Sequence, residues 1–188
     1  MIHKTVLIFL FLNVFVLTMF SQQGSSYDEL KTIKRVTGLT VKHKFLDIFS
    51  GKWKIKGMNY TGIAPEAVIG NATVESILGG HYLEINMELT QSLGSSHSRI
   101  IIGFDTRISK FSFFSIDDYA NFGLNCNGIK DDNKLIFEGK DYSLFYKKDL
   151  SFKIVIERER VNKFSYKVYY NFKDKNKLMI EYYFFKQQ

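Results

Sequence analysis

From Lys52 to the end of the chain, hydrophobic side chains recur at every second position, and no long helical pattern interrupts them. In Lys52–Lys56 the lysines alternate with Trp53 and Ile55, and in His81–Leu89 apolar and polar residues alternate without a break. A period of two places apolar side chains on one face of a β-strand and polar side chains on the other. The pattern predicts antiparallel strands, each with one face in water.

Eleven segments of this kind are joined by turn-forming sequences such as Lys130–Asn133 and Lys173–Asn176. One of the expected strands runs over Tyr119–Ile129. Short, evenly spaced strands favour a barrel or a sandwich, and consecutive tight turns favour an up-and-down order. We therefore predict an all-β fold, a single antiparallel up-and-down β-barrel of about ten strands preceded by one or two short helices.

The two helices are expected before the barrel. Ser26 and Glu29 have the spacing of a capping box, which predicts a short helix after Ser26. A second short helix is expected over residues 41–49, with an apolar face. The residues expected on that face are Val41, Phe45, Ile48 and Phe49.

An almost unbroken apolar run, Val6–Phe20, follows Lys4 and precedes the small residue Ser21. The run is shorter than the roughly 20 residues that span a bilayer as a helix, so it is typical of a secretory signal peptide rather than an uncleaved anchor. We expect residues 1–21 to be the signal peptide, residues 22–40 an N-terminal segment and residues 41–188 the barrel domain. The mature protein is then periplasmic or secreted, with no integral membrane segment and no cysteine at the cleavage point for a lipid.

The formal net charge is +7, and its excess lies at one end of the chain. Residues 22–146 hold 14 basic and 14 acidic side chains, whereas residues 147–188 hold 11 basic and 5 acidic ones. These C-terminal strands either contact an anionic surface or simply present a solvated face. Aromatic residues interleave with the lysines there, but an exported protein rarely meets nucleic acid, so no nucleic-acid partner is expected.

Three motifs in a fixed order suggest a family. A helix leads into Gly51-Lys52-Trp53, the segment Ile77–Leu83 carries Leu-Gly-Gly-His-Tyr-Leu, and Gly103-Phe104-Asp105 precedes Asp117. This order over residues 43–140 resembles the DUF1579 family, a group of mostly bacterial, often exported proteins. The resemblance implies a lipocalin-like or calycin-like barrel of undefined activity, and it draws attention to Asp117.

The chain departs from the family pattern at three places. His81, Phe104 and Ser115 stand where the family has Arg, Tyr and Trp, so a family ligand that uses those groups would be bound differently here. Lipocalins and the haem-binding nitrobindins are similar in architecture, but a nitrobindin-like site would use a histidine in the late strands, where this chain has none. No haem or other cofactor is expected.

Catalytic and metal-binding patterns are weak. The single cysteine, Cys126, is expected to be buried, and no cluster of histidine, cysteine and carboxylate has the spacing of a metal site. A catalytic triad of Ser96, His97 and Asp105 can be drawn, but a serine in a Gly-Ser-Ser loop is ordinary loop composition. We therefore expect no catalytic and no metal-binding residues, and an enzyme is the least favoured class.

The remaining site is the barrel interior. The inward side chains are expected to include Ile101, and Trp53 is expected to act as a structural plug. A small hydrophobic or amphipathic ligand is the favoured occupant, because small-molecule sites are largely apolar with a few polar groups. The alternative is a filled core, with a non-catalytic protein or envelope surface as partner. The candidate pocket residues are His81, Arg99, Asp117, Tyr166, Met87 and Phe113.

Overall fold

The computed structural model describes residues 28–34, 36–92, 94–143 and 146–187. The predicted signal peptide and the predicted capping residue Ser26 lie outside the described residues. Contacts divide the chain into two units that meet in sequence after Gly38. In the first unit, residues 28–34 and 36–37 are helical. Among the described residues, no helix has both the length and the hydropathy that crossing a bilayer requires.

The second unit begins with two short helices, α2 (Val41–Leu46) and the 3-10 helix η1 (Asp47–Phe49). Thr40 caps α2, because its side-chain oxygen accepts a hydrogen bond from the Lys42 N–H. In return, His43 Nδ1 accepts a hydrogen bond from the Thr40 N–H at 3.0 Å. Histidine thus takes the place that Glu or Gln occupies in the usual capping box.

The apolar face expected for residues 41–49 is partly wrong. Val41 is exposed, and the buried side chains of the two helices are His43, Leu46 and Phe49. The physical reason is that α2 ends after Leu46 and continues as a 3-10 helix. A 3-10 helix has three residues per turn, so the 3.6-residue period does not run through the whole segment.

Ten strands follow, in agreement with the expected number. Their bounds are β1 Gly51–Asn59, β2 Glu66–Ile77, β3 Tyr82–Gln91, β4 Gly94–Asp105, β5 Lys110–Asp117, β6 Leu124–Asp131, β7 Lys134–Ser143, β8 Lys148–Arg160, β9 Lys163–Phe172 and β10 Lys175–Lys186. A short 3-10 helix, η2 (Leu78–Gly80), joins β2 to β3.

The strand expected over Tyr119–Ile129 is wrong in its first part, because β6 begins only at Leu124. The reason lies in Asp117, whose Oδ1 accepts hydrogen bonds from the N–H groups of Tyr119 and Ala120 at 3.0 Å each. Aspartate side chains bind the backbone in this way in turns, and the bonds hold the chain in a turn at the end of β5.

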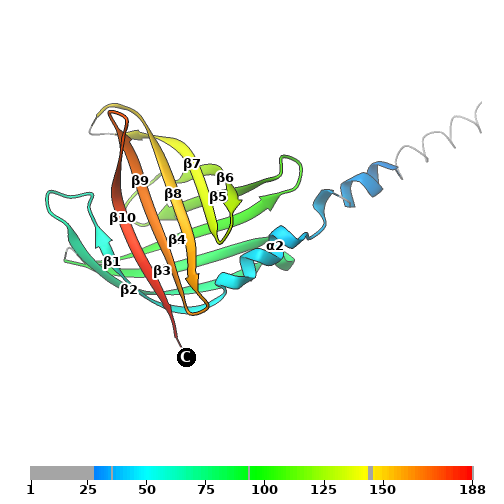
Figure 1. The fold of residues 1–188 in the computed structure, drawn as a ribbon, viewed down its shortest axis with the longest axis horizontal. Helices are drawn as coiled ribbons and strands as arrows, with labels where there is room; N and C mark the ends of the chain where they lie inside the picture. Colours follow the sequence, from blue (N-terminus) through cyan, green and yellow to red (C-terminus); the bar gives the residue numbers. More distant parts are fainter. Residues whose placement is uncertain (1–27, 35, 93, 144–145, 188) are drawn as a thin grey trace, which may run out of the picture. The chain divides into compact units, whose positions relative to one another are not determined.

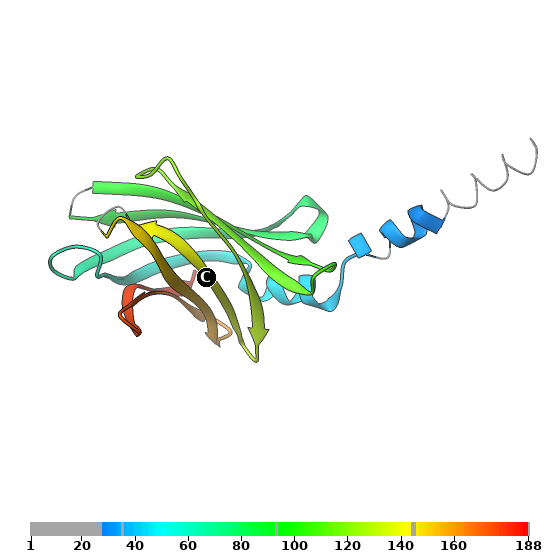
Figure 2. The ribbon, with the colours of Figure 1, turned by 90° about the horizontal axis from the view of Figure 1, so that it is seen from above.

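The strands form one closed barrel in which each strand pairs antiparallel with its sequence neighbours, and β1 pairs with β10. This confirms the predicted up-and-down barrel. Figure 1 shows β8, β9 and β10 crossing the direction of β2, β3 and β4. Seen from above in Figure 2, the cyan and green strands lie on one side and the yellow to red strands on the other.

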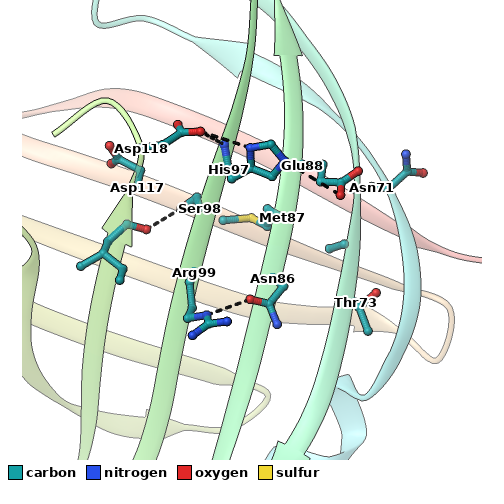
Figure 3. A pocket seen from close by; sticks show the side chains of 12 residues that line it. Asn71, Thr73, Asn86, Met87, Glu88, His97, Ser98, Arg99, Asp117 and Asp118 are labelled. Atoms are coloured by element: carbon teal, nitrogen blue, oxygen red, sulfur yellow. Dashed lines mark hydrogen bonds and ion pairs between the residues drawn. The ribbon is translucent and has the colours of Figure 1, made fainter.

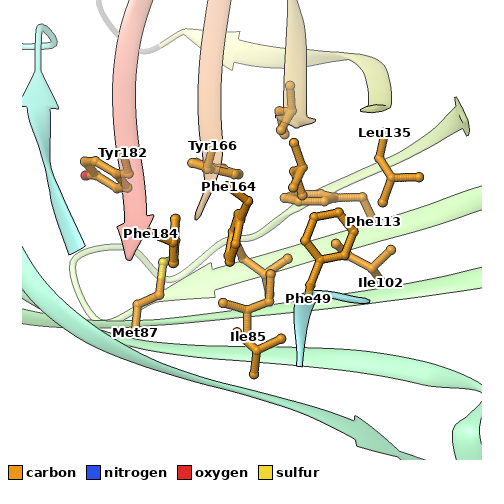
Figure 4. Close-up of a cluster of buried hydrophobic side chains, with 14 of the residues drawn as sticks. Phe49, Ile85, Met87, Ile102, Phe113, Leu135, Phe164, Tyr166, Tyr182 and Phe184 are labelled. Atoms are coloured by element: carbon orange, nitrogen blue, oxygen red, sulfur yellow. The ribbon is translucent and has the colours of Figure 1, made fainter. Parts of the chain in front are cut away.

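Inward side chains from opposite walls form a continuous hydrophobic core, part of which is drawn in Figure 4. The largest of its fully buried side chains are aromatic, and they include Trp53 at the start of β1 and Phe49 of η1. Trp53 is 1% exposed, its Nε1–H donates to the Phe49 carbonyl oxygen at 2.9 Å, and its ring lies 4.7 Å from that of Phe164. Trp53 therefore joins η1 to the inner wall and fills this end of the barrel.

Acidification is expected to destabilise the barrel through His43. Burial, and then the charge of His81 at a ring distance of 5.5 Å, lower the pKa of His43 below 6.5. As the pH falls below about 6.5, the unfolded chain takes up a proton at this residue before the folded chain does. The contribution of His43 to stability is therefore complete above about pH 6.5 and is lost as the pH falls toward the folded pKa.

Urea denaturation between about pH 7.5 and about pH 5 measures this effect. We expect the unfolding midpoint of the wild type to fall more steeply than that of His43→Gln, since glutamine can still accept from the Thr40 N–H without titrating. Equal slopes for the two proteins would show that His43 does not control the pH response.

Candidate functional site

The two ends of the barrel interior differ in the size of their side chains. Toward the end opposite α2, the inward residues of β2 and β4 have small side chains. Ala72 of β2 and Ser98 of β4 pair with Met87 of β3 on either side. In the adjacent row, Gly70 and Ser96 flank Leu89 in the same way. Small residues therefore flank Met87 and Leu89, and no aromatic side chain is present at these positions, in contrast to the aromatic end.

A pair of tyrosines lies on the other wall. Tyr166 on β9 pairs directly with Tyr182 on β10, and their rings stack with centroids 6.1 Å apart at 27°. Strand β9 is five strands from β4 in either direction around the barrel, so the pair lies across the interior from the small residues. Figure 4 shows both rings on one wall and Met87 on the wall opposite.

The hydroxyl groups of Tyr166 and Tyr182 make no hydrogen bond to any residue in the described part of the chain, although the two residues are only 7% and 5% exposed. Buried polar groups are usually paired, because an unmet hydrogen bond costs about 1–3 kcal/mol. Burial raises the pKa of Tyr166 and raises that of Tyr182 to about 12. Both phenols are therefore neutral at physiological pH and keep an O–H to donate.

A third inward tyrosine has a partner. Tyr170 O–H donates to Asp141 Oδ2 at 2.9 Å, and burial, followed by this bond, raises the pKa of Tyr170. Its ring lies 6.0 Å from Phe152 and 6.4 Å from Phe172. Aromatic rings thus continue from the tyrosine pair toward the connection between β9 and β10.

Asp117 occupies the last position of β5, at an inward place in the alternation after Phe111 and Phe113. Its carboxylate closes the turn described above, as expected for a rim aspartate. Its negative charge also contributes to the raised pKa of both Tyr166 and Tyr182. Asp117 is therefore near enough to act electrostatically on the tyrosine pair.

A groove of about 510 Å³ lies on the outer surface of β2–β5 (Figure 3). Its lining residues are Asn71, Ala72, Thr73, Asn86, Met87, Glu88, His97, Ser98, Arg99, Ile116, Asp117 and Asp118. Arg99 Nε donates to Asn86 Oδ1 at 3.1 Å and lies 3.3 Å from Glu84 Oε1. Arg99 is thus engaged by neighbouring side chains of β3.

His97 is the centre of a second polar cluster in the groove. Its Nδ1 lies 3.1 Å from Asp118 Oδ2, its backbone N–H donates to the same oxygen at 2.9 Å, and its Nε2 lies 4.0 Å from Glu88 Oε1. The backbone bond and then the ring bond lower the pKa of Asp118. The His97 and Glu88 side chains are 69% and 75% exposed, so water surrounds this cluster and screens its charges.

The arrangement does not assemble the triad drawn from the sequence. Ser96 is buried on the inner face of β4, His97 is exposed on the outer face, and Asp105 is at the other end of the strand. Among the described residues, no group of three histidine, cysteine or acidic side chains is placed to hold a metal ion.

The structure brings some predicted site residues together and separates others. Met87, Phe113 and Tyr166 are buried on the inner wall, and Asp117 ends an inward row. His81 lies at the opposite end, where its ring meets that of His43.

Arg99 is not inward, and neither is Ile101. In β4 the buried positions are Ser96, Ile100 and Ile102, so the odd-numbered residues between them face outward. The run Ile100–Ile102 is apolar on both faces, and its sequence therefore carries no alternation that could reveal which face is inside. Pairing with β3 decides the face.

The sequence pattern does not single out Tyr182 as a site residue. It lies among the consecutive aromatic residues Tyr182–Phe185, where either face could be inward. The only signal was its spacing of two from Phe184, and its partner Tyr166 follows only from the register of β9 and β10.

Cys126 is expected to resist thiol reagents while the protein is folded. Its side chain is buried, and burial raises the pKa of the thiol to about 12, so the reactive thiolate is scarce at neutral pH. We expect iodoacetamide labelling at about pH 8 to be at least about 100-fold slower in the native protein than in urea. Similar labelling rates in the two conditions would mean that β6 opens readily.

The chain is similar to a protein family and to solved structures. The family described as "Protein of unknown function (DUF1579)" matches residues 39–187. A search of curated proteins finds no match. Among solved structures, a de novo designed fluorescence-activating β-barrel is similar, at 11% identity, with a TM-score of 0.42 over 76% of this chain and 96% of that chain. EF1p2_mFAP2b bound to DFHBI is similar at 8% identity, with a TM-score of 0.44 over 77% of this chain and 98% of that chain. Because the family match spans most of the chain, including the whole barrel, this protein belongs to the DUF1579 family.

Proposed function

We propose that this protein binds a small, largely apolar molecule inside the barrel. The observation that carries the proposal is the tyrosine pair: two tyrosine residues, each more than nine-tenths buried, whose hydroxyl groups have no hydrogen-bond partner among the described residues. A ligand with a polar group would satisfy them, as polar groups in apolar sites commonly orient small molecules.

The architecture supports entry from the end opposite α2. At that end the strand connections include the segment after Asp117, where Tyr119 and Phe122 are 63% and 54% exposed. The helical end is occupied by Phe49 and Trp53, both 1% exposed. A ligand would therefore lie between the tyrosine pair and the small residues that flank Met87, with its apolar part against the core.

Binding of the neutral fluorescent probe N-phenyl-1-naphthylamine tests the proposal. We expect saturable binding of one probe per protein, and a loss of at least about tenfold in affinity in Ser98→Phe, which fills the inner wall. Arg99→Phe adds the same ring to the outer face at the next position and should bind like the wild type. Ala72→Leu and Thr73→Leu form a second inner and outer pair if Ser98→Phe does not fold. Absence of saturable binding, or equal effects on the two faces, would overturn the proposal.

A second function is favoured by the closure of the barrel. Pairing of β1 with β10 places the exposed lysines Lys52, Lys54 and Lys56, here called the β1 lysines, beside the aromatic residues Tyr183 and Phe185. No ion pair joins a β1 lysine to another described residue. By contrast, two C-terminal lysines are neutralised by neighbours: Lys163 by Glu159 at 2.6 Å and Lys167 by Glu181 at 3.0 Å. We propose that the β1 lysines contact an anionic lipid surface.

Co-sedimentation with phosphatidylglycerol vesicles, with phosphatidylcholine vesicles as reference, tests this contact. Each lysine near an anionic surface contributes about 1 kcal/mol, so replacing the three β1 lysines by serine should weaken binding at least about tenfold. The matched control replaces Lys173 of the β9–β10 turn and Lys175 and Lys177 at the start of β10 by serine. An equal loss in the control would show that net charge, and not this face, governs the interaction.

We also propose that residues 1–21 direct export, as their composition predicts. Fractionation of cells that express the full chain, compared with a chain beginning at Gln22, tests it. Retention of both chains in the cytoplasm would contradict export.

A further inference from the structure

We infer that the molecule held inside the barrel is an organic cation, an ammonium group carried on an apolar chain or ring. The inference rests on the proposed interior binding and adds the charge of the ligand. It is carried by three features of the end opposite α2: carboxylates at inward positions, hydroxyls without partners, and aromatic faces.

Carboxylates occupy the inward positions near the tyrosine pair. Glu66 begins β2, Asp117 ends β5 and Asp141 lies near the end of β7, each in phase with the buried residues of its strand. At the start of β8, Lys148 is exposed but also in phase with the buried residues of its strand, whereas Asp149 is not. The described inward positions at this end thus hold three carboxylates and one lysine.

Two other inward lysines lie at the helical end of the barrel. The Lys130 ammonium lies 4.7 Å from the centre of the Phe45 ring, and the Lys186 ammonium lies 5.5 Å from that of Trp53. Both contacts are with the aromatic residues of the helical end. Neither lysine is placed to neutralise an anion bound beside Tyr182.

The three carboxylates accept hydrogen bonds from neighbouring groups. Asp117 accepts from two backbone N–H groups, Asp141 accepts from the Tyr170 hydroxyl, and Glu66 accepts from the N–H and hydroxyl of Ser92. These bonds hold the carboxylates in place at the ends of their strands.

Their field reaches the tyrosine pair. Burial is the main cause of the raised pKa of Tyr166 and of Tyr182; the charge of Asp117 makes a smaller contribution at both, and that of Glu66 at Tyr182. A field that opposes a phenolate also opposes a bound carboxylate at the same place, and it stabilises a bound ammonium. The site thus selects against fatty acids, which the apolar interior alone would accept.

The tyrosine pair itself suits an ammonium group. A cation within about 6 Å of an aromatic ring centre is attracted by the negative face of the ring, and aromatic cages bind ammonium ligands in this way. Tyr166 and Tyr182 offer ring faces and phenol oxygens that can accept a hydrogen bond, and Tyr170 and Phe172 continue the aromatic wall. The apolar tail would lie against Met87 and Leu89.

The test compares three probes with the same ten-carbon chain and different head groups: decyltrimethylammonium, decanol and decanoate. Each is titrated below its micelle concentration as a competitor of N-phenyl-1-naphthylamine, at low ionic strength. We expect the ammonium to compete at a concentration at least about tenfold lower than decanoate, with decanol between them. If decanoate competed at the same concentration as the ammonium, the inference would be overturned, but the proposed interior binding would still stand. Failure of the naphthylamine and of all three probes to bind would overturn the proposed function and this inference with it.

Two variants at adjacent residues test which carboxylate causes the preference for the ammonium probe over decanoate. Asp117→Asn keeps an acceptor for the turn but removes the charge, so the ratio between ammonium and decanoate should fall by at least about threefold while decanol binding is unchanged. Asp118→Asn removes a charge of the same size from the outer cluster with His97 and should keep the wild-type ratio. An equal fall in both variants would assign the preference to overall charge and overturn the role of the inner wall.

Discussion

Trp53→Ala is expected to lower the free energy of unfolding by about 3–5 kcal/mol, the usual cost of truncating a fully buried large aromatic residue. Trp53 fills the helical end of the barrel against Phe164, and its Nε1–H is the hydrogen-bond donor to the Phe49 carbonyl group. The substitution would leave a cavity and an unpaired carbonyl oxygen, and it would release η1 from the wall. Urea denaturation followed by circular dichroism measures the change.

Two control variants separate the contributions. Trp53→Phe keeps an aromatic ring but loses the hydrogen bond, so a smaller loss of about 1–2 kcal/mol is expected. Lys54→Ala changes the neighbouring outward residue and should stay within about 0.5 kcal/mol of the wild type. A loss below about 1 kcal/mol for Trp53→Ala would mean that this end of the barrel does not depend on the plug.

Gly70→Ala is expected to destabilise the barrel by at least about 2–3 kcal/mol, although it adds only one methyl group. A Cβ atom at Gly70 would lie 2.2 Å from the Glu88 carbonyl oxygen and 3.1 Å from Leu89 Cα. These atoms belong to the backbone of β3, so the steric clash can be removed only if β2 and β3 move apart near Met87. Thermal and urea unfolding measure the effect.

Gly62→Ala is the matched control. It lies in the connection between β1 and β2, where a Cβ atom would meet only the Ala64 carbonyl oxygen at 3.6 Å, an ordinary contact. Its stability should lie within about 0.5 kcal/mol of the wild type. If both glycine variants lost the same stability, the close approach of β2 and β3 would not be the cause.

Local patterns in the sequence predicted the strands well wherever one face is polar. In β3 the alternation of Leu83, Ile85 and Met87 with polar residues specified both the strand and its buried face. The same reasoning placed Phe113 and Tyr166 inside. It failed at Ile101, where neighbouring isoleucines remove the alternation, and at Val41, where two kinds of helix interrupt the period.

The candidate site could be predicted only in part from the sequence, for a different reason. The sequence pointed to Met87, Asp117 and Tyr166 as separate residues on three strands. It could not show that Tyr182 stacks on Tyr166, because that contact depends on the register of β9 with β10.

The sequence by itself determined the all-β class, the approximate strand number, the plug at Trp53 and the family pattern, because these depend on side-chain period and local turn chemistry. Only the tertiary structure decided the register in which the strands pair. Pairing of β1 with β10 placed the β1 lysines beside the last strand and set the tyrosine pair across the interior from the small residues of β2–β4. Such contacts join residues that are far apart in the chain, and their register is set by the closed hydrogen-bond network of the barrel rather than by any local pattern.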